Sequence, residues 1–223
     1  MKRAVCITAF LASMAAPLAA QAQALNYGTL DAQRPNTVHA EVGAEYAFVM
    51  SGGYSRTIQL GDRPLVVGGM LTVPWAKLDL HDYQLRSTVA APLVGDRKWK
   101  LVGRVAPTLR GTKNDINRMT GFATDFSFLG GYYAPRGFVA ADLGFDWAIS
   151  THIKHSDEYR RTHYAGAKDG WYATPGGNFH AGLQGGFSVR SVDFTLRFAH
   201  VRDVRLQPLF LPFAATAGVN VHW

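Results

Sequence analysis

The chain has 223 residues, is 48% hydrophobic and 12% aromatic, and carries a formal net charge of +7 at pH 7. This length suits a single domain, and no Pro- or Ser-rich linker divides it. The only cysteine is Cys6, near the N-terminus. Downstream of it the sequence therefore excludes disulfides, thiolate metal sites and a cysteine nucleophile.

The first 24 residues follow the order of a secretory signal peptide. Lys2 and Arg3 are followed by an apolar stretch over residues 5–18 and then by small residues in an A-x-A pattern. That order is typical of an exported precursor. We expect cleavage after Ala22 or Ala24, which lowers the net charge to +5 by removing the two cations from +7. A retained amphipathic helix is the alternative.

Beyond this segment, apolar residues recur at every second position. In the first such stretch Val38, Ala40 and Val42 alternate with His39 and Glu41. A period of two indicates a strand whose two faces meet different environments. The alternation predicts ten strands, at residues 37–50, 53–60, 64–75, 83–94, 98–110, 119–131, 138–151, 177–190, 191–202 and 211–223.

The strands are long and their connections alternate in length. Most of these segments exceed the about 5–6 residues common in globular proteins, and they match the about 9–11 residues that a tilted strand needs to cross a bilayer. Short turns are expected at residues 61–64, 95–97, 133–137 and 190–191. The other end would carry loops at residues 51–53, 76–82, 111–118, 152–175 and 203–210. Short turns at one end and longer loops at the other are typical of outer-membrane barrels.

We therefore predict an all-β fold, in which residues 37–223 form a closed antiparallel up-and-down transmembrane β-barrel. Ten strands are expected, and eight are the alternative. A strand in lipid cannot leave its backbone groups unpaired, so the sheet must close. The apolar face would meet lipid and the polar face the lumen. A soluble barrel would show the same alternation with the faces exchanged, but the signal peptide and strand lengths favour the membrane. Residues 25–36 would form an N-terminal periplasmic segment.

The C-terminal residues alternate and then end in an aromatic residue, with Val219, Val221 and Trp223 on one face. This ending resembles the C-terminal assembly signal of bacterial outer-membrane β-barrel proteins, although their usual final residue is Phe. The motif covers the last strand, while the strand pattern extends the resemblance over most of the chain without indicating a subfamily. The resemblance implies recognition by the barrel-assembly machinery and a location in the outer membrane of a Gram-negative bacterium. We expect a monomer.

The predicted luminal face carries charges of both signs. A small barrel is filled by side chains, and buried charges need partners. We therefore predict a salt-bridged network that plugs the lumen. Its members would be Glu41, Glu45, Arg86, Arg104, Asp125, Asp142, Asp146 and Arg197. A plugged lumen favours a structural or surface-interaction role, and the alternative is a narrow channel for small polar solutes.

A lipid-modifying enzyme is a second alternative. It would need a nucleophile with a base in reach. His39 lies beside Glu41 on one face, and His180, Ser188 and Asp146 lie elsewhere, but no spacing is specific. We predict no catalytic residues, and we predict no cofactor and no metal because no phosphate-binding loop or metal-ligand spacing is present.

The predicted long loop mixes cations with aromatic residues. If it is extracellular, its cations could bind phosphates of lipopolysaccharide through charge-assisted hydrogen bonds. The candidates are Lys154, His155, Arg160, Arg161 and Lys168. Asp157, Glu158 and Asp169 temper this charge, so a merely solvated loop is the alternative. Outer-membrane lipids are the expected partners, and the export signal argues against nucleic acid.

Overall fold

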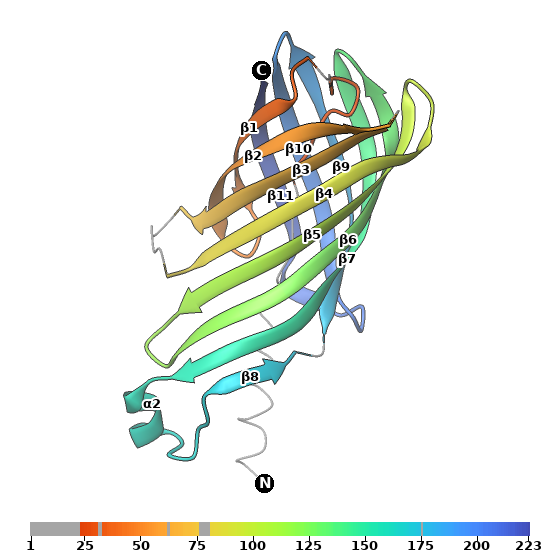
Figure 1. Ribbon diagram of the computed structural model, residues 1–223. Helices are drawn as coiled ribbons and strands as arrows, with labels where there is room; N and C mark the ends of the chain where they lie inside the picture. Colours follow the sequence, from red (N-terminus) through yellow and green to blue (C-terminus); the bar gives the residue numbers. More distant parts are fainter. Residues whose placement is uncertain (1–22, 31–32, 62, 76–80, 175) are drawn as a thin grey trace.

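The computed structural model of the protein describes residues 23–30, 33–61, 63–75, 81–174 and 176–223. Most of the predicted signal peptide, residues 1–22, lies outside these ranges. The described chain forms one antiparallel sheet that closes into a barrel (Figure 1). No helix in the described ranges is long and apolar enough to cross a membrane.

Ten strands form the barrel, which confirms the predicted number and excludes eight. They are β1 (Asn36–Ala44), β2 (Phe48–Leu60), β3 (Arg63–Pro74), β4 (Tyr83–Gly95), β5 (Trp99–Lys113), β6 (Asn117–Ala134), β7 (Gly137–His155), β9 (Gly177–Val189), β10 (Val192–Asp203) and β11 (Pro208–His222). Between β7 and β9 lie the helix α2 (Asp157–Thr162) and the short strand β8 (Gly170–Ala173). Neighbouring barrel strands pair in order, β7 pairs with β9, and β1 pairs with β11 to close the barrel.

Alternate residues of each strand face the lumen and the outside. On β10, Asp193 and Arg197 are buried, whereas Leu196 is 67% exposed and Phe198 55% exposed. The cause is the two-residue period of a strand, whose side chains point to opposite faces. Because most of the buried side chains are polar, the barrel is apolar outside and largely polar inside.

The first hairpin differs from the prediction. The sequence predicted a turn at residues 51–53, but β1 ends at Ala44 and β2 begins at Phe48. The alternation predicted the wrong position for this turn because Tyr46 and Phe48 continue the two-residue apolar period through it. Gly53 lies inside β2 instead, where a Cβ atom would come within 2.6 Å of the Gly69 carbonyl oxygen. This glycine therefore permits the close approach of two strands, not a turn.

The two ends of the barrel differ in shape. Connections of two or three residues join the strands at one end, here the short-turn end, and the longer connections, such as those between β3 and β4 and between β7 and β9, lie at the other, the long-loop end. β6 and β7 are the longest strands, with 18 and 19 residues. Figure 1 shows them running beyond the rest of the long-loop end, together with α2 and β8. We call this extension, residues 111–121 and 150–173, the ledge.

Residues 23–30 lie inside the barrel near the short-turn end. Leu25 and Tyr27 are 3% and 4% exposed and belong to one apolar cluster with inward residues of the strands. The Asn26 amide donates hydrogen bonds of 2.9 Å to the Ala134 carbonyl and to Ser188 Oγ. The segment, here called the inner plug, thus fills the lumen with both packing and hydrogen bonds.

Candidate functional site: the filled lumen

The eight predicted luminal charges all point into the barrel and are buried. Their exposure ranges from 0% for Asp125 and Asp142 to 7% for Glu41. They come from β1 and the turn that follows it, and from β4, β5, β6, β7 and β10. Charges this deep require compensation, because burying an isolated ion costs several kcal/mol.

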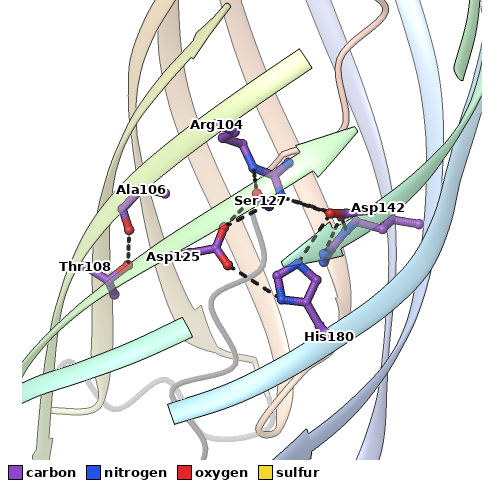
Figure 2. A network of polar contacts seen from close by, with 8 residues as sticks. Arg104, Ala106, Thr108, Asp125, Ser127, Asp142 and His180 are labelled. Carbon is purple, nitrogen blue, oxygen red and sulfur yellow. Dashed lines mark hydrogen bonds and ion pairs between the residues drawn. The ribbon is translucent and has the colours of Figure 1, made fainter. Parts of the chain in front are cut away.

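Asp142 on β7 is the centre of the best-connected group (Figure 2). Arg197 of β10 donates to its carboxylate from Nε at 2.8 Å and approaches with Nη2 at 2.7 Å. Arg104 of β5 reaches it at 3.5 Å, and His180 Nε2 lies 3.3 Å away. Asp142 on β7 is therefore linked to side chains from β5, β9 and β10, and its contacts with β5 and β10 reach strands that are not its neighbours in the sheet.

A second carboxylate, Asp125 on β6, lies on the other side of the same histidine. The Nδ1 atom of His180 is 3.6 Å from Asp125. Ser127 Oγ donates to Asp125 at 2.9 Å and accepts from Arg104 Nε at 2.8 Å. Figure 2 shows these side chains converging between β5, β6 and β9. The Asp142 network therefore contains carboxylates, guanidinium groups and a histidine in alternation, which is the arrangement that stabilises buried charge.

The long-loop half of the lumen is less tightly bonded. Arg86 is 1% exposed, and none of its guanidinium nitrogens has a direct hydrogen-bond partner within the described ranges. Glu45, Asp125 and Asp146 attract its guanidinium group over longer distances, without offsetting the cost of its burial. Gln84, on the same strand, is 1% exposed and also makes no direct side-chain hydrogen bond to the described chain.

Near the short-turn end, the structure brings together residues that the sequence pattern did not group. His39 Nδ1 lies 3.0 Å from Asn220 Oδ1, and its Nε2 lies 2.8 Å from Ser55 Oγ. The order Ser–His–Asn is also that of an activated nucleophile. Here all three side chains are at most 3% exposed, and Asn220 donates to the Ala24 carbonyl of the inner plug. The three side chains are therefore buried beneath the inner plug within the described part of the chain.

A matching cluster surrounds His222. Its Nε2 lies 2.8 Å from Asp193 Oδ2, and its Nδ1 lies 3.0 Å from Thr37 Oγ1. Thr37 and His222 are direct partners in the pairing of β1 with β11. Knowledge of that register would have revealed both histidine clusters, but the register depends on closure of the barrel.

The five candidate lipopolysaccharide-binding residues do not form one site. Lys154 and His155 lie on β7 and not in a loop, because that strand is longer than predicted. Arg160 of α2 contacts Asp169 Oδ2 at 2.6 Å, and the His155 amide donates to Asp169 Oδ1 at 2.9 Å. The hydrogen bonds from His155 and Arg160 hold the pKa of Asp169 below its ordinary value. Two of the five candidates are therefore tied to an internal carboxylate.

The remaining candidates stay exposed. Arg161 lies in the last turn of α2, and Lys168 precedes β8, with no ion pair to either in the described part of the chain.

The residues of the predicted assembly signal lie on the seam. Val221 and Trp223 face outward, at 41% and 52% exposure, and Val219 is partly buried on the same face. Trp223 exchanges backbone hydrogen bonds of 3.1 and 3.2 Å with Asn36. These residues thus contribute to closure of the barrel. Their recognition by the barrel-assembly machinery stays a prediction.

Among the described residues, no group of three His, Cys, Asp or Glu side chains is placed to hold a metal ion. Comparison of the chain with models of known protein families and with curated proteins gives no match. The filled lumen and the exposed face of the ledge are the two candidate sites that the geometry defines.

Proposed function

We propose that the protein is an outer-membrane β-barrel with a filled lumen, and that its role in a Gram-negative envelope is structural or surface-interacting. The observation that carries the proposal is the inverted polarity of the barrel. Phe126, Leu143 and Leu196 are 44%, 57% and 67% exposed, while Asp125 and Asp142 are 0% exposed. Leaving an apolar belt in water costs about 25 cal/mol per Å², whereas hydrocarbon matches it without cost.

Aromatic residues near both ends of the strands support a membrane boundary at each end. At the short-turn end Trp99 contacts Tyr132 edge-on at 5.5 Å. At the long-loop end Trp147 and Trp171 are 53% and 58% exposed. Trp and Tyr favour the two membrane interfaces, where an apolar ring and a polar edge are both accommodated. The short turns would face the periplasm and the ledge the exterior.

The contents of the lumen favour a closed barrel over a pore. The Asp142 network crosses the lumen from β5 to β10, and the inner plug fills the short-turn end. Passage of a solute would require breaking charge pairs that are no more than 1% exposed at their side chains. The buried Ser–His–Asn cluster likewise supports a structural role over lipid-modifying catalysis.

Heat-modifiability tests the membrane barrel. A folded transmembrane barrel resists SDS without boiling and migrates differently from the boiled chain, because its closed backbone pairing persists in detergent. We expect two bands of different mobility for the protein extracted from outer-membrane fractions. A single mobility, or recovery in the soluble fraction, would contradict the proposal.

Conductance in planar bilayers separates a filled lumen from a channel. We expect no discrete conductance steps after insertion of the intact protein. Reproducible steps with charge selectivity would instead support passage of small polar solutes through the lumen.

A further inference from the structure

Three cations stand side by side on the outward face of the ledge. Lys113 on β5 pairs with Arg118 on β6, and Arg118 pairs with Lys154 on β7. All three side chains are exposed. Residues directly opposite on antiparallel strands have Cβ atoms about 4.5–5.5 Å apart. The three charges, here called the cation row, therefore lie within roughly 10 Å along the sheet.

A β-bulge brings Lys154 into this row. The pairing of β6 with β7 passes over Ile149, which has no partner on β6. One extra residue reverses which side chains face outward. Trp147 faces out before the bulge at 53% exposure, and Lys154 faces out after it. An unbroken alternation would have turned Lys154 toward the inner face.

The cation row lacks an anionic partner in the described part of the chain. None of its members forms an ion pair there within 4 Å. The ledge carboxylates Asp157 and Asp169 contact Arg160. Like charges directly opposite on neighbouring strands are destabilising, so an external anion bridging them would stabilise the row.

The cation row lies at the depth expected for a lipid phosphate in the membrane. β5 runs 15 residues from Trp99 to Lys113. At about 3.3 Å per residue and a tilt of about 40°, the row lies roughly 35 Å above Trp99. A hydrocarbon core is about 25–30 Å thick. The row is thus just beyond the hydrocarbon, at head-group level.

An aromatic layer lies directly below the row, on the membrane side. Trp171 contacts His152 at 5.1 Å and Phe122 at 5.8 Å. His152 precedes Lys154 by two residues on the same face of β7, and Phe122 lies deeper still on β6. Aromatic side chains favour the membrane interface, and cations just above them lie at the level of lipid phosphates. The order of aromatic layer and cation row therefore matches the order of acyl chains and phosphate in a lipid.

We propose that the cation row binds the phosphate groups of lipid A, the membrane anchor of lipopolysaccharide. The proposal rests on the proposed outer-membrane function. The Arg118 guanidinium offers a fork of N–H donors to phosphate oxygens, and Lys113 and Lys154 flank it with ammonium groups. The contact surface is therefore the side wall of the ledge, and not the α2 loop that contains Arg160 and Arg161.

Native mass spectrometry of the detergent-purified protein tests this proposal. The triple variant K113Q/R118Q/K154Q is compared with the control R161Q/K168Q/R205Q, which removes three exposed cations from the same end of the barrel. Each is titrated with diphosphoryl lipid A, monophosphoryl lipid A and inorganic phosphate. We expect the row variant to bind diphosphoryl lipid A about tenfold more weakly, with wild type and control alike. Monophosphoryl lipid A should show a smaller difference.

The outcomes separate the alternatives. Equal weakening in both variants, or in neither, overturns the row as a site. If inorganic phosphate binds the row as well as lipid A does, the commitment to a lipid is wrong. A wild-type protein without a heat-modifiable band overturns the proposed function, whereas a heat-modifiable protein indifferent to lipid A overturns only this inference. If the triple variant lacks the folded band, R118Q alone should weaken binding about threefold.

Discussion

The two halves of the lumen are filled by different means. In the short-turn half, the inner plug packs Leu25 and Tyr27 into an apolar cluster, and the polar groups around it make short direct hydrogen bonds. In the long-loop half, Arg86 interacts with carboxylates only over longer distances and makes no direct hydrogen bond to the described chain. The Asp142 network lies between them.

This difference indicates which parts of the lumen contribute most to the stability of the barrel. Packing and direct hydrogen bonds are lost outright when one partner is removed. Attraction over longer distances is weaker, and replacing one such charge leaves no hydrogen-bonded partner unsatisfied. The short-turn half and the Asp142 network should therefore tolerate substitution poorly, and the long-loop half should tolerate it better.

The largest effect is expected at the boundary between the halves. Asp142→Ala leaves Arg104 and Arg197 buried without their shared carboxylate. Loss of one partner of a buried charge pair costs about 3–5 kcal/mol. Urea unfolding in lipid vesicles should show this loss, whereas D115N, in an exposed turn where the described residues form no ion pair with it, should change little. Equal stability of the two variants would mean that the network does not hold the strands.

Tyr27→Ala tests the short-turn half. Tyr27 is 4% exposed and contacts Tyr133 edge-on at 5.5 Å, so its removal leaves a cavity in the apolar cluster. We expect a loss of about 3 kcal/mol in the free energy of unfolding. Tyr164→Ala is the matched control, because Tyr164 is 62% exposed on the ledge. A Tyr27 variant as stable as the control would show that the inner plug is only loosely held.

Arg86→Met compared with Arg104→Met tests the contrast directly. Both arginines are buried, but only Arg104 donates to Ser127 and reaches Asp142. We expect R86M to cost about 1 kcal/mol or less, because no partner loses a direct hydrogen bond and the desolvation penalty of the guanidinium group is also removed. R104M should cost about 3 kcal/mol. If R86M proves as costly as R104M in the same urea titration, the two halves do not differ as described.

The smallest effect concerns the ledge and depends on pH. The folded-state pKa of Asp169 is lowered by hydrogen bonds from the His155 amide and from Arg160. A lowered pKa stabilises the folded ledge above the ordinary pKa of the carboxyl group, and the stabilisation fades as the pH falls below it. Limited proteolysis between pH 6 and pH 3, with an acid-active protease, should show the ledge opening toward low pH. D169N should be equally susceptible at both pH values.

Much of the architecture follows from the alternation of residue types. It identified the ten strands and the inward side of charges such as Arg104 and Asp142, because a two-sided environment imposes its period on the sequence. The alternation failed at the first turn, where Tyr46 and Phe48 continue the apolar rhythm, and at Ile149, where one extra residue shifts the phase. A bulge changes geometry without a change in composition.

The contents of the lumen were only partly predictable. The charges were recognisable, since polar residues alternate with apolar ones on each strand. The inner plug was not, because residues 23–30 carry no periodic pattern and their place depends on the finished barrel. The cluster of His39 with Asn220 depends on the pairing of β1 with β11, which local sequence does not encode.

The seam between β1 and β11 has a consequence for the timing of folding. Ala44 pairs with Ala215 and Thr37 with His222, so the last pairing joins the strands most distant along the chain. Contacts of such separation form slowly, because most of the chain must be ordered before they are gained. Until then β1 and β11 both present an open edge that can pair with another molecule. A nascent chain would therefore need a companion that protects these edges until the barrel closes.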